Sequence, residues 1–327
     1  MNVEKIADWG IAQHPLYALD IDPLTNTLYA GGLDSALLKV PLGLQEIKQG
    51  GFEKLGQYIE RILGLKNPVY TLFYDPQQNA IWAGGSKGWV QKFDLKTSTF
   101  STTYNLGPYP IFSFQSDLLH NALLVSQGNG LIHSLTEENL NNNTLEGGEF
   151  KEKEISTYKI SDDAIRVMKY SNDGKELATA GKDGKIRVLD SESLQEKHRI
   201  EAHAFPIFAL AYSPDGTYLL SGSRDASIKI WRTEDYKLIQ TIPAHLFAIN
   251  QILFHPTLPY FLSASMDKSI KIWGSDDFKL YKILNAEKTG GHTTSVNRMV
   301  FTNAPSPSLI SIGDDRRMLI WHLDFET

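Results

Sequence analysis

The chain has 327 residues, 42% of them apolar, so it can bury a large hydrophobic core. Its net charge of −6 provides no general basic field for nucleic acid, and the lack of Cys excludes disulfides and Cys-based zinc sites. No stretch approaches 18 consecutive apolar residues, so the sequence predicts a cytoplasmic protein that neither spans a membrane nor binds nucleic acid.

One sequence frame recurs along the whole chain at intervals of about 40 residues. Its marker is a polar residue, usually Asp, with an apolar residue six positions later. In chain order the markers are Asp34, Lys87, Asn129, Asp183, Asp225, Asp267 and Asp315. Seven such units indicate an array of like structural elements. A repeat also argues against a single catalytic centre, because an enzyme needs its key residues once.

The first predicted element is a strand at residues 3–8. It precedes the first repeat and occupies the position that a fourth strand holds in the other repeats. The last repeat stops after its third strand, at residues 320–323. We therefore expect the N-terminal segment to complete the last sheet and cover its open edge.

Two insertions interrupt the period between a third and a fourth strand. The first is residues 41–56, followed by a predicted strand at 57–63, although the apolar spacing from Phe52 to Ile62 would also suit one face of a helix. The second is residues 136–149, a predicted polar loop. Both insertions are expected on the rim opposite the Asp turns.

The fifth repeat shows the unit most clearly. Short apolar segments at 207–212, 218–221, 227–231 and 237–242 are separated by turn residues, which indicates four strands. Such a sheet is apolar on both faces and must stack on neighbours. Radial closure meets this need, so the sequence predicts an all-β, seven-bladed propeller of four-stranded antiparallel blades.

A His, Ser, Asp and Trp constellation occurs three times. One interpretation is a Ser-His-Asp hydrolase. The other is a structural chain in which Trp meets Ser, Ser meets His and His meets Asp. Three copies favour the structural tetrad, and no catalytic residue, cofactor or metal site is predicted. The tetrads are His203, Ser221, Asp225, Trp231; His245, Ser263, Asp267, Trp273; and His292, Ser311, Asp315, Trp321.

These motifs resemble the WD-repeat β-propeller family. Ala-His203, Ala-His245 and Gly-His292 stand where the family has its Gly-His pair, and each of these repeats ends in Ile-Trp. The resemblance weakens in repeats 1 to 4, which lack the Trp, so blades 1 to 3 are expected to depend mainly on apolar packing. It implies a single domain spanning residues 1–327, with repeats at roughly 11–63, 64–106, 107–158, 159–200, 201–242, 243–284 and 285–323 plus 3–8.

A further triplet recurs just after the His loop. Four repeats have Pro, an aliphatic residue and an aromatic residue, and the third residue of the triplet should lie at the mouth of the central channel, on the Asp-turn face. In similar propellers this rim contacts peptides or proteins. The predicted rim consists of Tyr17, Tyr70, Phe112, Arg166, Lys182, Phe208 and Arg224.

Three functions are compatible with this pattern. The first is a non-enzymatic scaffold, monomeric unless in a complex, that binds a protein or peptide at the predicted rim, whose Arg and Lys residues would suit an acidic partner. The second is a propeller enzyme or small-molecule binder with its site in the channel mouth. The third is a complex subunit that docks through the 41–56 insertion on the opposite rim.

Overall fold

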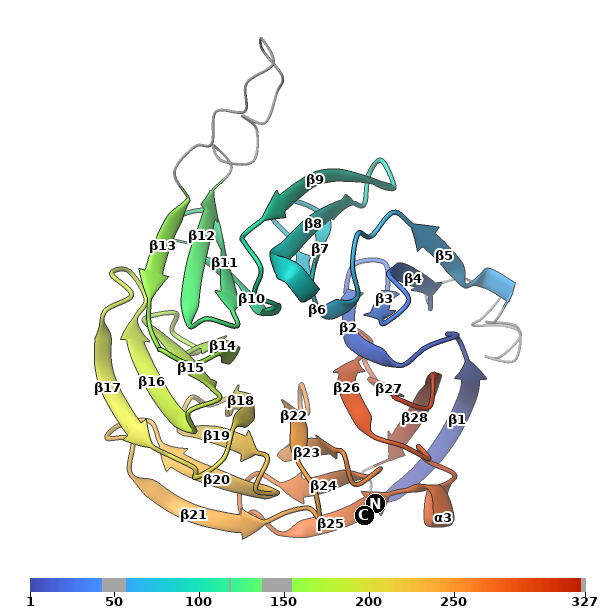
Figure 1. Ribbon diagram of the computed structural model, residues 1–327. Coiled ribbons are helices and arrows are strands. Elements are labelled where there is room, and N and C mark those ends of the chain that lie inside the picture. The colour runs from blue at the N-terminus through green and yellow to red at the C-terminus, as the bar shows by residue number, and fades with distance from the viewer. Residues whose placement is uncertain (43–56, 118, 137–154, 325–327) are drawn as a thin grey trace.

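Seven four-stranded antiparallel sheets surround a common centre, each forming one blade (Figure 1). The computed structural model describes residues 1–42, 57–117, 119–136 and 155–324. The prediction of an all-β, seven-bladed propeller is confirmed.

The strands of each blade follow one another from the centre outward. Blade 1 contains β2 (Leu16–Asp22), β3 (Thr27–Gly32), β4 (Ala36–Pro41) and β5 (Glu60–Leu63). Blade 2 contains β6 (Val69–Asp75), β7 (Ala80–Gly85), β8 (Trp89–Asp94) and β9 (Thr99–Asn105), with a short 3-10 turn, η2 (Ser86–Gly88), before β8. Blade 3 contains β10 (Ile111–Asp117), β11 (Ala122–Gln127), β12 (Leu131–Thr136) and β13 (Ser156–Lys159).

The remaining blades repeat this order. Blade 4 contains β14 (Ile165–Tyr170), β15 (Glu176–Gly181), β16 (Lys185–Asp190) and β17 (Glu196–Glu201). Blade 5 contains β18 (Ile207–Tyr212), β19 (Tyr218–Ser223), β20 (Ser227–Arg232) and β21 (Leu238–Pro243). Blade 6 contains β22 (Ile249–Phe254), β23 (Tyr260–Ser265), β24 (Ile270–Gly274) and β25 (Leu280–Leu284). A short helix, α3 (Ala286–Thr289), leads to β26 (Val296–Phe301), β27 (Leu309–Gly313) and β28 (Arg317–Asp324) of blade 7.

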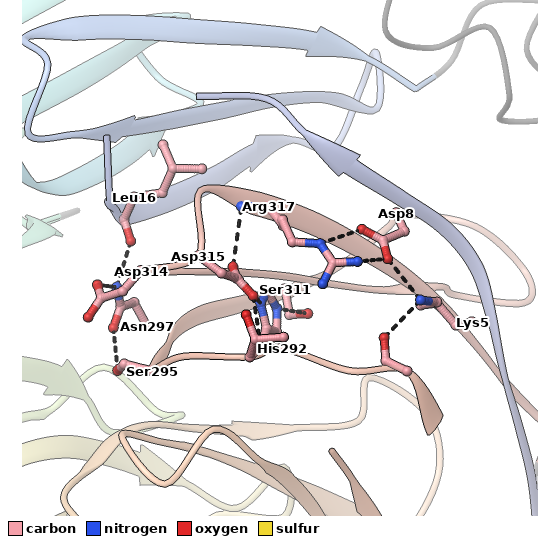
Figure 2. Close-up of polar contacts among 12 residues, drawn as sticks. Lys5, Asp8, Leu16, His292, Ser295, Asn297, Ser311, Asp314, Asp315 and Arg317 are labelled. Atoms are coloured by element: carbon pink, nitrogen blue, oxygen red, sulfur yellow. Dashed lines mark hydrogen bonds and ion pairs between the residues drawn. The ribbon is translucent and has the colours of Figure 1, made fainter. Parts of the chain in front are cut away.

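The fourth strand of blade 7 is the N-terminal strand β1 (Asn2–Gly10). It pairs antiparallel with β28, with Val3 opposite Leu323 and Asp8 opposite Leu319. The two chain ends therefore meet at one blade (Figure 1). Arg317 on β28 forms an ion pair with Asp8, and Lys5 donates to Asp8 and to the Gly290 carbonyl, both at 2.8 Å (Figure 2). The predicted closure by the N-terminal segment is confirmed.

Hydrophobic packing lies between blades. Each pair of neighbouring blades in the described chain shares one buried apolar cluster, made of residues from the facing sides of two sheets. Trp82 lies fully buried between blades 2 and 3, and Trp321 between blades 6 and 7. The second strands β3, β7 and β11 are buried along their whole length, whereas the outer strands β13, β17 and β21 are largely exposed. The inner strands therefore have the more apolar sequences.

The turn between the second and third strands of a blade requires one left-handed residue. Ala226, Lys268 and Arg316 have positive φ in the turns that follow Asp225, Asp267 and Asp315. Asp225 stabilises its turn by accepting the Ser227 backbone N–H at 2.9 Å. This short side chain fixes the turn although the left-handed residue is not Gly.

The two insertions begin as expected after the third strands, β4 and β12. The chain resumes as a strand at β5, so the strand alternative holds for residues 60–63. The expected helix or loop at 43–56 and the expected polar loop at 137–149 lie outside the described residues.

Candidate functional site

The innermost strand of every blade has the same irregularity at its second residue. The pairing register shifts there, so one residue per blade bulges out of the ladder and aims its side chain away from the sheet. The seven bulged residues are Tyr17, Tyr70, Phe112, Arg166, Phe208, Asn250 and Asn297. Their strands surround the centre of the ring, so the bulges give one side chain from each blade to the channel.

These side chains line a single cavity of about 550 Å³ at one end of the channel. We call this cavity the funnel, and it lies on the Asp-turn face because its wall includes Leu33 and Met266, which directly precede Asp34 and Asp267. Its lining residues are Tyr17, Leu33, Tyr70, Pro110, Phe112, Arg166, Phe208, Asn250, Met266, Asn297 and Arg298.

One side of the funnel is aromatic. The rings of Tyr17 and Tyr70 meet edge to face with centroids 6.1 Å apart, and Tyr70 stacks on Phe112 at 6.2 Å. All three side chains are half-buried, so each ring keeps a surface toward the cavity. Burial and the negative charge of Asp314 raise the pKa of Tyr17, so its hydroxyl stays protonated at neutral pH.

Arg166 extends this aromatic arc. Its guanidinium carbon lies 4.6 Å from the centre of the Phe112 ring and 5.1 Å from that of Phe208. Its Nε is buried without a hydrogen-bond acceptor. Burial lowers the pKa of Arg166, yet a guanidinium remains charged at neutral pH. A cation is thus held between two rings with unused donors.

The opposite side of the funnel is polar and internally bonded. The Asn250 amide donates to the Val296 carbonyl at 2.8 Å, and that of Asn297 donates to the Leu16 carbonyl and Asp314, each at 2.7 Å (Figure 2). These bonds join blade 6 to blade 7 and blade 7 to blade 1. Their amide groups are therefore occupied by the protein, in contrast to Arg166.

A second cavity of about 460 Å³ continues below the funnel into the channel. It shares Phe112, Arg166, Phe208, Asn250 and Arg298 with the funnel, and its deeper wall includes Asp20 and Lys169. Asp20 accepts the Tyr74 backbone N–H at 2.7 Å, while burial raises its pKa. Burial lowers the pKa of Lys169, although the Asp20 charge opposes this shift. The channel therefore has charged groups below the mouth.

Five of the predicted rim residues line the funnel, and two do not. Lys182 is exposed on the same face and forms an ion pair with Asp163 at 2.8 Å. Arg224 is also exposed but is absent from the lining. Of the basic residues of the predicted rim, Arg166 lines the funnel, and so does Arg298, which the sequence analysis did not select.

Exposed apolar side chains surround the funnel. Phe205, Leu246 and Phe247 are 52%, 82% and 62% exposed and lie in the His loops of blades 5 and 6. Met266, 50% exposed, connects them to the funnel because its backbone N–H donates to Ala248. The apolar rim comprises Leu33, Tyr109, Phe205, Leu246, Phe247 and Met266. The missed signal was large apolar residues within two positions after the tetrad His, at Phe205, Leu246 and Phe247.

The predicted tetrads are connected in space. The Trp231 indole donates to Ser221 Oγ at 2.9 Å, Ser221 Oγ lies 2.8 Å from His203 Nε2, and His203 Nδ1 lies 2.8 Å from Asp225. A neutral His with its hydrogen on Nδ1 satisfies every member. The same bonds join the tetrads of His245 and His292.

This geometry gives the tetrads a structural task. Ser221, Ser263 and Ser311 are fully buried, and each lies between a Trp and a His. A nucleophile would have to be reached by a substrate, whereas these hydroxyls bond within the blade. The tetrads instead connect the His loop with the Asp turn, both of which border the funnel face.

Comparison with known families agrees with the architecture. The model of the WD domain, G-beta repeat, matches residues 194–232 and 236–274, and that of the anaphase-promoting complex subunit 4 WD40 domain matches residues 150–208. With the seven blades, these matches place the chain in the WD-repeat family. A search of curated proteins finds no match. No helix in the described parts of the chain is long and apolar enough to cross a membrane.

Proposed function

We propose that this protein is a non-enzymatic scaffold that binds a protein or peptide partner at the funnel and the apolar rim. Proteins of the WD-repeat family typically serve as interaction scaffolds. The observation that carries the proposal is the convergence of one bulged residue from every blade on one open cavity, five of them aromatic or Arg. These residue types dominate the energetics of protein interfaces.

The arrangement also keeps the entropic cost of binding low. The arc of Tyr17, Tyr70 and Phe112 is preassembled by ring contacts, and the bulges that orient it belong to closed blades. A partner would therefore order few side chains of this protein when it binds. The apolar rim also exposes hydrophobic surface, and burial of this surface by a partner would stabilise the complex.

The types of side chain on the funnel wall favour binding over catalysis. None of the described residues that line the funnel is a His, Asp or Glu, the types most often used for proton transfer. Asp20 and Lys169 lie deeper in the channel. The expected cytoplasmic location and monomeric state stay predictions.

A photocrosslinking experiment tests this proposal. A photoreactive amino acid replaces Phe247 on the apolar rim or, as matched control, Leu119, which is 67% exposed in a turn on the opposite rim. We expect one partner to be captured in cells from position 247 and not from 119. Purified with that partner, Tyr70→Ala should weaken binding by about 2 kcal/mol or more, as at an interface hot spot, with little loss of stability.

Two results would contradict the proposal. One is capture of a partner from position 119 alone, which would direct attention to the rim that bears the insertions. The other is a captured partner whose affinity is the same for wild type and Tyr70→Ala. Leu24→Ala, at a site 82% exposed on the opposite rim, shows the background effect of removing a surface side chain.

A further inference from the structure

We propose that the partner inserts the carboxylate of an internal Glu or Asp into the funnel, where Arg166 receives it. This inference rests on the proposed function and specifies its chemistry. It begins from a guanidinium that two rings hold in position and whose buried Nε has no acceptor among the described residues.

The immediate surroundings of Arg166 fix its orientation without neutralising it. Phe112 and Phe208 contact its guanidinium, and burial makes the charge costly to leave unpaired. A guanidinium has five N–H donors in one plane, which match the two oxygens of a carboxylate. The rings supply no acceptor in that plane, and Arg166 lines the cavity, so a carboxylate in the funnel would meet its terminal amino groups.

The charges on the rest of the funnel wall also favour an acidic ligand. Among the described residues no carboxylate lines the funnel, and the nearby Asp314 accepts the Asn297 amide at 2.7 Å. Arg298 also contributes a positive charge, but its Nη1 donates to the Asn250 and Asn297 carbonyls at 3.1 and 3.0 Å. Two arginines on the wall against Asp314 beside it leave a net positive charge at the cavity, although the protein as a whole has a net charge of −6. That charge favours an acidic group and disfavours a basic one.

The number of free donors favours a carboxylate over a phosphate. Arg298 already uses donors on two carbonyls, and the remaining wall is aromatic, aliphatic or amide. A phosphate group carries more charge and three strong acceptor oxygens, so it needs several donors to replace its water. One free guanidinium beside aromatic rings suits a single carboxylate with an apolar neighbour on the arc.

The apolar rim indicates an internal residue rather than a chain end. Exposed side chains flank the funnel on blades 5 and 6, at Phe205 and Phe247, and on blades 1 and 3, at Leu33 and Tyr109. A segment that crosses the face contacts both groups while one acidic side chain points into the funnel. A C-terminal carboxylate would end the chain at the centre and leave one group uncovered.

Peptide display tests this inference with a defined probe. A random twelve-residue library, displayed with both ends blocked by fusion or linker, is selected against wild type, Arg166→Gln, Arg166→Lys and Tyr70→Ala. We expect wild type to select Glu or Asp at one fixed position beside an apolar residue. Arg166→Gln should lose the acidic preference and keep the apolar one, whereas Arg166→Lys should retain it weakly because Lys lacks the planar fork.

A cycle on the selected peptide measures the interaction itself. Replacing its Glu by Gln should weaken binding to wild type about tenfold or more, and to Arg166→Gln by less than about twofold. The matched control is Lys268→Gln, an exposed cation on the same face that does not line the funnel. It should show the wild-type Glu preference. Melting curves confirm that each variant is folded.

The outcomes separate this inference from the proposed function. Peptides that require Tyr70 but show no acidic preference would overturn the carboxylate assignment alone. So would an equal cost of Glu→Gln in wild type and Arg166→Gln, or a stronger preference for phosphoserine or for a free C-terminus in synthetic versions of the peptide. Selected peptides whose binding ignores both Tyr70 and Arg166 would contradict the funnel as the binding surface.

Discussion

Blades 5 to 7 and blades 2 to 3 attach the loop before the innermost strand by different chemistry. In blades 5 to 7 the loop His bonds both the buried Ser and the turn Asp. In blade 3, Gln127 donates to the Leu106 and Tyr109 carbonyls at 2.9 and 3.1 Å, and its oxygen lies 3.0 Å from His133 Nε2. In blade 2, Gln91 accepts the Lys66 N–H at 2.8 Å.

Blades 2 and 3 thus have buried polar bonds beside the apolar packing that was expected to hold blades 1 to 3, and whether apolar packing dominates stays a prediction. Gln91 and Gln127 are 5% and 0% exposed, and both bond loop backbone that would otherwise lose water without compensation. In blade 1, Asp34 keeps an ion pair with Arg61 at 3.2 Å. Blades 2 and 3 therefore bond this loop through a Gln side chain, whereas the ion pair of blade 1 joins its Asp turn to the outer strand β5.

We expect the largest effect from removal of β1. This deletion tests whether a tetrad can stabilise a blade that lacks its fourth strand. Blade 7 has a complete tetrad, yet deletion of residues 1–10 exposes the edge of β28 and removes the contacts of Asp8 and Lys5. We expect aggregation or a fall in melting temperature larger than for any substitution below. Asp8→Asn, which removes only the charge, serves as control and should cost little. Unchanged melting and solubility after the deletion would show that the tetrad suffices.

Substitution of a tetrad Asp measures how much its hydrogen bonds stabilise blades 5 and 6. Asp267→Ala should destabilise the protein by about 1–3 kcal/mol, because it leaves the N–H of His245 and the Leu246 N–H without their acceptor. Asp225→Ala should cost less within that range, since its side chain is 22% exposed compared with 7% for Asp267. Chemical unfolding gives both values, with the exposed Asp276→Ala as control. Equal stability of all three variants would show that the tetrads do not stabilise their blades.

Gln127→Met measures how much the hydrogen bonds of a buried amide stabilise blade 3. The side chains are similar in size, but Met cannot bond the Leu106 and Tyr109 carbonyls or His133 Nε2, so we expect a loss of about 1–2 kcal/mol. Gln78→Met, at a half-buried position in a blade 2 turn, controls for the exchange of amide for thioether. A neutral Gln127→Met would support the expectation that apolar packing holds blade 3.

The sequence predicted the features that recur in every blade, because repetition separates them from chance. The seven blades, the closure by β1 and the triplet that opens each inner strand were all visible in this way. Gln91, Gln127 and Arg298 were not, since each occurs in one blade only. The exposed Phe205 and Leu246 were missed for a related reason: a loop residue has no periodic neighbours to indicate which way it faces.

Local stability should follow the number of buried polar connections. Blades 5 and 6 add bonds from Lys229 to the Ala202 carbonyl and from Lys271 to the Ala244 carbonyl, at 2.5 and 2.6 Å. We therefore expect slower amide hydrogen exchange in residues 207–273 than in residues 99–136 at neutral pH, measured by mass spectrometry. The exchange of the Asp267→Ala variant in blade 6 provides the control. Equal protection of the two regions in wild type would mean that the amide networks are as effective as the tetrads.

Mild acid should accelerate hydrogen exchange more in blades 5 and 6 than in blade 2. The His residues of the tetrads take up protons in this range, whereas the Gln91 amide of blade 2 does not. Burial lowers the pKa of His203 and His245, although Asp225 and Asp267 oppose the shift and Lys229 and Lys271 add to it. In the unfolded chain these His residues take up a proton near pH 6.5. The unfolded state then binds more protons than the folded state, so the stability contributed by neutral His falls as pH decreases below about 6.5.

The tetrad carboxylates add nothing in this range. Burial by itself raises the pKa of Asp225, but its hydrogen bonds from Ser227 and His203 outweigh burial and lower it, so that group matters only near pH 4 and below. Residues 60–105 of blade 2 contain no His. Between pH 7 and pH 5.5, exchange corrected for its intrinsic pH dependence should therefore accelerate in residues 207–273 and change little in residues 60–105. Equal acceleration in both segments would indicate that acid acts on the ring as a whole rather than through the tetrads.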